Sequence, residues 1–170
     1  MTLLPPVSTR VMNLATLLTQ AARRDPDGVA LVIGDTRWSW AEFEAGADAL
    51  AAALQGMGLQ KGDRVMVQSQ NCLEMMQAMF AVWRVGGVWV PANFRQTPDE
   101  VVYLTQASGA RGLICNAAFP NHAAACQAGC PDLRWTLSIG AGDFGPSLQA
   151  VTDDHMGQRP QVEAVEREDP

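Results

Sequence analysis

Apolar residues along this chain follow two spacings, and the alternation between them predicts its secondary structure. Segments with an apolar residue at every third or fourth position indicate helices, and short continuous runs such as VMV, VWV and LIC indicate strands buried on both faces. Glycine and proline separate these segments. The expected helices cover residues 13–25, 40–55, 72–85, 98–108, 117–128 and 147–151, a β-hairpin covers 29–40, and further strands cover 64–68, 88–90, 112–115 and 135–139.

Polar residues just before the helical segments predict where helices begin. Asn13 and Asn71 are expected to cap the first and third helices. Ser39, followed three residues later by Glu42, predicts a capping box for the second helix. In the first helix we expect one apolar face, made of Leu14, Leu17, Leu18, Ala21 and Ala22.

Strands that alternate with helices of about 10 to 15 residues are typical of βαβ units. The expected fold class is therefore α/β, with layered α/β/α architecture, a mainly parallel Rossmann-like sheet and an N-terminal β-hairpin. We expect a flexible lead-in over residues 1–12, one α/β subdomain over 13–152, and an acidic, disordered tail over 153–170.

Net charge and the distribution of apolar residues argue against some classes of protein. The net charge is −6 with only 12 basic residues, which argues against a nucleic-acid partner. No signal peptide opens the chain, and no apolar run reaches the roughly 18 residues of a membrane span. We therefore expect a cytoplasmic protein that is not integral to a membrane, with its four cysteines reduced.

Three histidine and cysteine residues at helical spacing raise the question of a metal site. His122, Cys126 and Cys130 would share one helix face, but a structural zinc site needs four ligands and this chain has no CxxC pair. Asp153, Asp154 and His155 lie in a flexible acidic segment, for which a solvated loop is the default interpretation. We expect no metal site.

The segment Gly140–Gly145 spells GxGxxG directly after an expected strand. A dinucleotide site needs this loop to run into a long helix, with an acidic residue ending a second strand about 20 positions later. Pro146 follows at once and Glu163 lies in no recognisable strand, so an ordinary glycine-rich loop is favoured. A small nucleotide-binding domain that uses this loop remains one alternative.

The stretch AVWRVGGVWVPANFRQTPDEVVYLTQASGARGLI resembles a segment of the adenylate-forming (AMP-binding enzyme) superfamily, which includes acyl-CoA synthetases, peptide-synthetase adenylation domains and luciferases. The upstream WSWAEF segment and the hairpin fit the beginning of that pattern, so the resemblance covers about residues 13–139. Asn93 stands where peptide-synthetase domains typically carry Asp, which favours the AMP-forming acyl-CoA synthetases.

This resemblance implies a ligase that joins a carboxylic or fatty acid to AMP with ATP and Mg²⁺ and then transfers the acyl group to CoA. The family's Ser/Thr/Gly-rich loop with its lysine does not occur in these 170 residues, so no catalytic residue is assigned. We expect a truncated N-terminal fragment that is inactive alone and binds none of these cofactors. The alternative is a complete, non-enzymatic binding or interaction module.

Only one loop is proposed as part of a site. Asn93 and Arg95 follow an expected strand at the edge where open α/β sheets generally place their ligands, so they are expected to line or brace the cleft of the intact enzyme. The other explanation is that they only shape the loop. A homodimer through an exposed hairpin or sheet surface is also expected.

Overall fold

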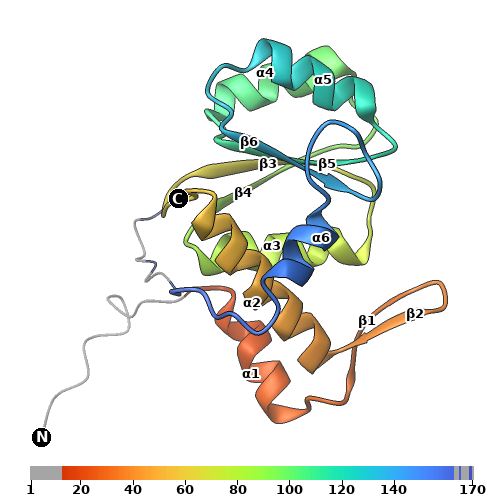
Figure 1. Ribbon diagram of the computed structural model, residues 1–170, viewed down its shortest axis with the longest axis vertical. Helices are drawn as coiled ribbons and strands as arrows, with labels where there is room; N and C mark the ends of the chain where they lie inside the picture. Colours follow the sequence, from red (N-terminus) through yellow and green to blue (C-terminus); the bar gives the residue numbers. More distant parts are fainter. Residues whose placement is uncertain (1–12, 163–164, 166–168, 170) are drawn as a thin grey trace, which may run out of the picture.

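Figure 1 shows a layered α/β arrangement in the computed structural model, which describes residues 13–162, 165 and 169. The central sheet has four parallel strands in the order β4-β3-β5-β6, so the predicted fold with a parallel sheet is confirmed. Its strands are β3 (Arg64–Gln68), β4 (Val88–Ala92), β5 (Gly112–Asn116) and β6 (Trp135–Ile139).

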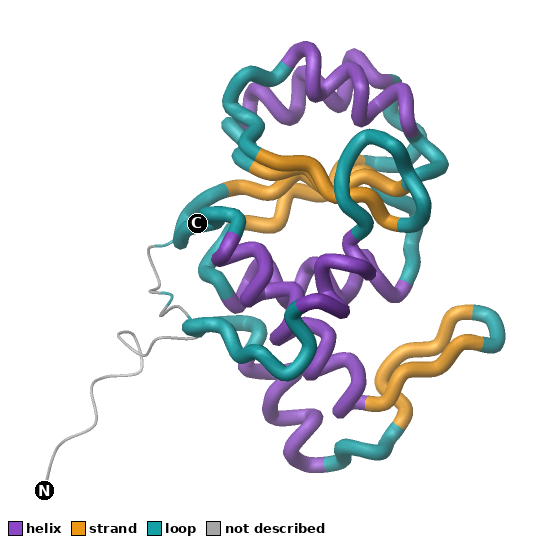
Figure 2. Tube along the Cα trace, viewed as in Figure 1, coloured by secondary structure: helices purple, strands orange, loops and turns teal. Residues whose placement is uncertain are grey.

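Helices cover both faces of this sheet (Figures 1 and 2). Two helices, α4 and α5, lie together over one face, whereas α2, α3 and α6 cover the other. None of the helices in the described part is long and apolar enough to cross a membrane. The bounds are α2 (Trp40–Gly56), α3 (Leu73–Arg84), α4 (Pro98–Ser108), α5 (Pro120–Gly129) and α6 (Leu148–Asp154).

Strand β3 sends side chains into both layers of the core. Val65 and Val67 join the apolar cluster beneath α2 and α3, and Met66 joins the cluster beneath α4 and α5. All three residues are buried, which explains why this strand is apolar at successive positions instead of at alternate ones.

The predicted hairpin is confirmed and lies apart from the parallel sheet (Figure 1). Its strands are β1 (Val29–Ile33) and β2 (Thr36–Ser39), which form an antiparallel pair with Gly34 in the turn at φ 58°. Leu31 and Trp38 pack against the buried cluster around Phe43. The exposed apolar residues of this hairpin are Val29, Val32 and Ile33.

The two expected helix starts have different outcomes. Asn13 Oδ1 accepts a hydrogen bond from the Ala15 amide at 2.9 Å, which is the bond expected of a cap, but α1 (Thr16–Arg24) begins only after Ala15. Asn13 Nδ2 also donates to the Trp83 carbonyl at 2.6 Å. Helix α3 follows Cys72 without any side-chain cap, so the prediction that Asn71 caps it is wrong.

The expected apolar face of α1 is also partly wrong. Leu18 and Ala21 are buried, as predicted, but Leu14 and Leu17 are 47% and 55% exposed. Only a narrow stripe of this helix therefore faces α2.

Local sequence forms a capping box at the start of α2 and another at the start of α4. Ser39 and Glu42 exchange hydrogen bonds at the start of α2, which confirms the prediction. Thr97 and Glu100 form the same arrangement at the start of α4. These contacts fix where the two helices begin because each satisfies amides that the helix leaves unpaired.

Pro91 lies within a strand, although the sequence predicted that it would end one. Strand β4 continues to Ala92, and Pro91 is in register with Val67 of β3. This is possible because β4 is an edge strand, where a residue without an N–H is tolerated on the outward side.

The ends of the chain are described only in part. The lead-in expected over residues 1–12 lies outside the described residues, as do 163, 164, 166–168 and 170 of the expected tail. Within the tail, the Gln161 amide donates to Gln55 Oε1 at 3.0 Å, and Gln55 Nε2 donates to the Gln161 carbonyl at 2.7 Å. The division into lead-in, subdomain and tail stays a prediction.

Candidate functional site

The carboxyl ends of β3 and β5 bring polar side chains together. From β3 the chain passes to β4 on one side and later to β5 on the other, so the boundary between β3 and β5 is the topological switch point. Asn116, which ends β5, donates to Ser69 Oγ at 3.4 Å, directly after β3. Open α/β sheets bind their ligands at this kind of edge.

The loop after β4 borders the same edge and is organised by its own side chains. The Arg95 amide donates to Asn93 Oδ1 at 3.0 Å, and the Asn93 amide donates to Gln96 Oε1 at 2.9 Å. A third bond joins the Gln96 amide to the Asn93 carbonyl at 2.9 Å. Asn93 therefore sets the shape of this loop.

Arg95 projects from the loop as an available positive charge. Its guanidinium carbon lies 5.1 Å from the centre of the neighbouring Phe94 ring, and both side chains are exposed. The ion pairs found among residues 13–162, 165 and 169 do not involve Arg95. A guanidinium of this kind suits carboxylate or phosphate groups.

Asn93 and Arg95, the two expected site residues, thus lie in one loop. The Asn93 side chain is hydrogen bonded within the loop, whereas the Arg95 side chain is exposed beside the Phe94 ring. Sequence reasoning missed Gln68, Ser69 and Asn116, which share this edge. Each comes at the end of a buried apolar run, and that position was the available signal.

Three of the four cysteines, Cys115, Cys126 and Cys130, are buried in the core. Burial raises the pKa of Cys115 to about 12 and that of Cys130 to about 11, and burial also raises the pKa of Cys126. Their thiols are therefore protonated near neutral pH, whereas a metal ligand must be a thiolate. His122 points elsewhere, with Nε2 at 2.8 Å from the Gln96 carbonyl.

The acidic segment near residue 155 also has local partners. Asp153 accepts a hydrogen bond from Gln149 at 2.8 Å, and His155 Nδ1 lies 2.9 Å from the Val151 carbonyl. Within the described ranges no group of three histidine, cysteine or acidic residues is arranged to hold a metal ion.

The glycines of the GxGxxG segment are explained by close packing. A Cβ on Gly142 would lie 2.4 Å from Ser138 Oγ, and one on Gly145 would lie 2.4 Å from the Thr136 carbonyl oxygen. The loop folds back against β6, where the Ser138 amide donates to the Pro146 carbonyl at 2.9 Å. The following helix, α6, has seven residues.

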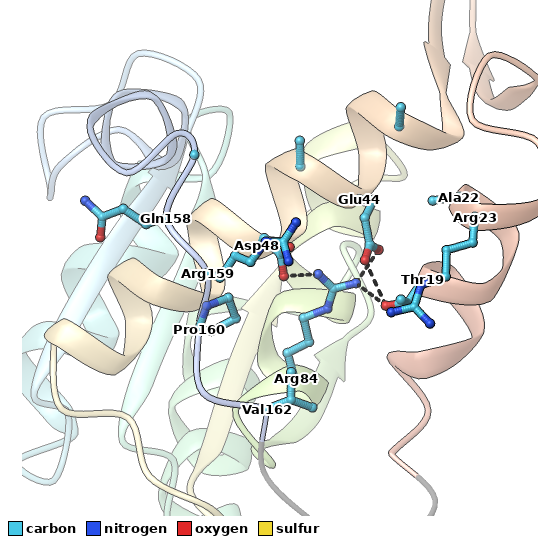
Figure 3. A pocket seen from close by; sticks show the side chains of 13 residues that line it. Thr19, Ala22, Arg23, Glu44, Asp48, Arg84, Gln158, Arg159, Pro160 and Val162 are labelled. Carbon is cyan, nitrogen blue, oxygen red and sulfur yellow. Dashed lines mark hydrogen bonds and ion pairs between the residues drawn. The ribbon is translucent and has the colours of Figure 1, made fainter.

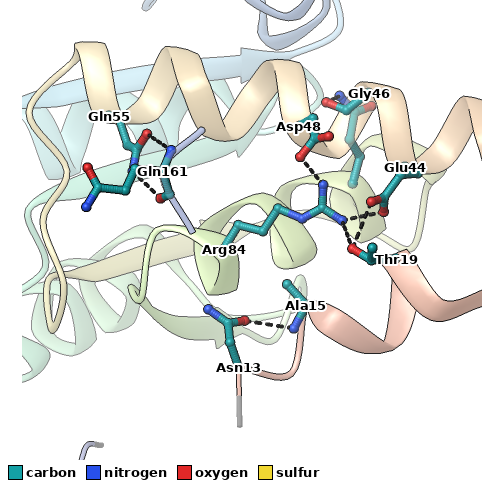
Figure 4. Close-up of polar contacts among 10 residues, drawn as sticks. Asn13, Ala15, Thr19, Glu44, Gly46, Asp48, Gln55, Arg84 and Gln161 are labelled. Atoms are coloured by element: carbon teal, nitrogen blue, oxygen red, sulfur yellow. Dashed lines mark hydrogen bonds and ion pairs between the residues drawn. The ribbon is translucent and has the colours of Figure 1, made fainter. Parts of the chain in front are cut away.

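A pocket of about 520 Å³ lies between α1, α2 and residues 157–162 (Figure 3). Its lining includes Arg84, whose guanidinium is hydrogen bonded to Asp48, Glu44 and Thr19 (Figure 4). Burial raises the pKa of Asp48, against the opposing effect of Arg84. Because the charged side chains of Arg84, Glu44 and Asp48 pair with one another, we interpret this pocket as the packing boundary between α1, α2 and α3.

Comparison with known proteins places most of this chain in one family. The profile of a family described as "AMP-binding enzyme" matches residues 18–170. A 2,3-dihydroxybenzoate-AMP ligase of Bacillus subtilis (strain 168) is 35% identical over 103 residues, which are 61% of this chain and 19% of that protein. A medium/long-chain-fatty-acid–CoA/3-oxocholest-4-en-26-oate–CoA ligase of Mycobacterium marinum is 30% identical over 131 residues, 77% of this chain and 24% of that protein.

Among solved structures, the anthranilate CoA ligase AuaEII in complex with anthranoyl-AMP has the same fold, with a TM-score of 0.86 at 21% identity. That match covers 94% of this chain and 30% of the AuaEII chain. The chain thus spans a fifth to a third of the length of these proteins.

Proposed function

The chain belongs to the AMP-binding enzyme family, and from that premise we propose that it forms the N-terminal α/β part of an ATP-dependent acyl-CoA synthetase. The complete enzyme joins a carboxylic acid to AMP with release of pyrophosphate and then transfers the acyl group to the thiol of CoA. The family match over residues 18–170 carries this proposal.

The names of the relatives support the reaction class more strongly than the substrate. The Bacillus subtilis relative is an AMP ligase of an aromatic acid, and the Mycobacterium marinum relative is a CoA ligase of fatty and steroid acids. Activation of a carboxylate is common to them. A fatty acid is our proposed substrate class, on the resemblance of the segment around Asn93 to the acyl-CoA synthetases.

The described residues do not provide a site for the phosphates of ATP. The sequence has a single lysine, Lys61, which precedes β3 at the opposite edge of the sheet and pairs with Asp169 at 2.8 Å. No glycine-rich loop here combines free amides with a lysine, and no carboxylate cluster among the described residues suits Mg²⁺. We therefore derive no step of ATP chemistry from these residues.

Arg95 is the residue that we propose to contact a cofactor. Its exposed guanidinium borders the sheet edge and is held by a loop that Asn93 organises. CoA carries phosphate groups that a guanidinium binds well. In this proposal Arg95 binds an anionic group of CoA and Asn93 keeps the loop in the binding shape.

We further propose that these 170 residues are inactive by themselves. The test is to incubate the purified chain with ATP, Mg²⁺, CoA and a panel of fatty and aromatic acids, and to measure AMP release. We expect none above the blank. Release of AMP that depends on the acid would contradict the proposal.

A chimera tests the positive part of the proposal. Residues 13–162 would replace the aligned segment of the Mycobacterium marinum ligase, and circular dichroism would establish that the chimera is folded. We expect acid-dependent formation of acyl-CoA. A folded chimera without activity, beside an active parent ligase, would count against the assignment.

Cytoplasmic location and self-association also remain proposals. The exposed apolar side chains Val29, Val32 and Ile33 on the hairpin support the second of them.

A further inference from the structure

Two hydrogen-bond acceptors beneath the loop of residues 93–96 have no donor. They are Oε1 of Gln68, whose side chain is fully buried, and Nδ1 of His122. Buried polar atoms in folded proteins nearly always have a partner, so an unpaired acceptor calls for an explanation other than stability.

Both side chains donate a hydrogen bond to the same loop. Gln68 Nε2 donates to the Phe94 carbonyl at 3.5 Å, and His122 Nε2 lies 2.8 Å from the Gln96 carbonyl. A carbonyl oxygen only accepts, so His122 carries its proton on Nε2 and leaves Nδ1 as the unpaired acceptor.

Gln68 and His122 reach the loop through one continuous layer of contacts. Gln68 ends β3 in register with Cys115 of β5. Cys115 Sγ donates to the Phe119 carbonyl at 3.5 Å, and the Phe119 ring meets the His122 ring edge to face at 5.4 Å. The two side chains therefore lie on the same side of the sheet, between the end of β3 and the first turn of α5.

These two hydrogen bonds attach the loop to β3 and α5. Among the hydrogen bonds of the described residues, only those from Gln68 and His122 join residues 93–96 to another element. The remaining bonds of the loop run between Asn93, Arg95 and Gln96 themselves. The loop is thus organised by its own hydrogen bonds, and two further hydrogen bonds attach it to the neighbouring elements.

We propose that Gln68 and His122 are positioning residues that set where this loop sits, and with it the direction of Arg95. The inference rests on the proposed function for the role of Arg95, but the attachment itself does not. Each attachment is a single hydrogen bond. Single hydrogen bonds contribute modestly to stability, so the loop can be released locally.

The test compares amide hydrogen exchange in three variants of the 170-residue chain. His122→Phe keeps the ring contact with Phe119 but removes both ring nitrogens, and His122→Gln restores a donor of similar reach. Gln68→Leu removes the second attachment in the same way. Exchange is followed by NMR at the Arg95 and Gln96 amides, with α2 amides such as Leu50 as the internal control.

We expect His122→Phe and Gln68→Leu each to accelerate exchange at Arg95 and Gln96 by about 3- to 10-fold, the effect of losing one ordinary hydrogen bond. His122→Gln should bring the rate back toward that of the wild type. Leu50 should be unchanged, because it is fully buried in α2 and the opening of a surface loop is a local event that does not unfold this helix.

Unchanged exchange at Arg95 and Gln96 in both His122→Phe and Gln68→Leu would overturn the positioning role. An equal acceleration at Leu50 would also overturn it, because the residues would then act on the whole fold.

The KM for CoA of the chimera that carries residues 13–162 separates this result from the proposed function. A KM that Arg95→Ala raises, and that His122→Phe raises in the same direction, supports both ideas. If Arg95→Ala leaves the KM for CoA of the active chimera unchanged, the cofactor assignment fails, whereas faster loop exchange in the variants still supports the positioning role.

Discussion

The guanidinium of Arg84 on α3 is paired with the carboxylate of Asp48 on α2, and Arg84 is only 2% exposed. Glu44, one turn earlier on α2, pairs with the same guanidinium, and Thr19 of α1 accepts a further hydrogen bond at 3.2 Å (Figure 4). One cation therefore joins three helices on the side of the sheet away from α4 and α5.

Replacing Arg84 should be one of the most damaging single changes in the protein. Arg84→Ala leaves Glu44 and Asp48 without a cation in a half-buried site, so we expect a loss of about 3 to 5 kcal/mol of unfolding free energy. Urea denaturation measures this loss. Arg37→Ala on the exposed hairpin is the control, with an expected change below about 0.5 kcal/mol. A loss below about 1 kcal/mol for Arg84→Ala would show that the ion pairs contribute little.

Glu100 should titrate below its usual value. Hydrogen bonds from the Thr97 backbone and side chain lower its pKa from 4.5. The unfolded chain then binds the proton more readily, so the stabilising contribution is present above about pH 4.5 and is lost as the pH falls through the folded-state pKa. NMR titration of the Glu100 carboxyl measures the shift, and Thr97→Ala should reduce it. A Glu100 pKa at or above 4.5 in the wild type would refute the capping box.

Adding a methyl group at Gly145 should destabilise the fold. A Cβ there would lie 2.4 Å from the Thr136 backbone oxygen, which cannot move aside as a side chain can. We expect Gly145→Ala to cost about 1 to 3 kcal/mol in thermal or urea unfolding. Gly56→Ala in α2 is the matched control, because nothing lies within 4 Å of its Cβ position. Helix propensity predicts that this second change is neutral or stabilising.

Glycine variants of this loop also test the alternative that residues 140–145 bind a nucleotide. If the loop serves packing alone, calorimetry with millimolar NAD or ATP should show no binding heat in the wild type. Measurable heat that Gly142→Ala or Gly145→Ala abolishes, in a folded variant, would favour the nucleotide site instead.

The hairpin should mediate concentration-dependent self-association. Val32 and Ile33 are 47% and 44% exposed, and β1 pairs with no described strand other than β2. Val32→Lys should therefore shift light scattering toward the monomer, because a charge on the exposed surface opposes association. Tyr103→Lys, at another exposed apolar position on α4, should leave the mass unchanged. A wild-type chain that stays monomeric at high concentration would exclude this role for the hairpin.

Sequence reasoning succeeded where the cause of a structure is local. The capping box of Ser39 and Glu42 depends on residues three positions apart and was predicted correctly. The parallel sheet followed from the alternation of strands and helices. The bond from Asn13 Nδ2 to the Trp83 carbonyl, 70 positions away, was not predicted, because no local pattern reveals that partner.

The candidate site was predictable only in part for a similar reason. Asn93 and Arg95 were found because they follow a strand in a loop. Gln68 and Asn116 escaped notice, since their meeting at one edge depends on the order in which the strands lie side by side. The contact of His122 with the Gln96 carbonyl was also missed, because these two residues are far apart in the sequence.

Pro91 lies in β4, one of the two edge strands of the parallel sheet. A fifth strand approaching from outside would need an amide proton at that position and would find a pyrrolidine ring. Pro91 therefore opposes the addition of further strands to β4, whereas β1 and β2 of the hairpin contain no proline. We therefore expect unwanted polymerisation of this protein to begin at the hairpin and to spare the β4 margin.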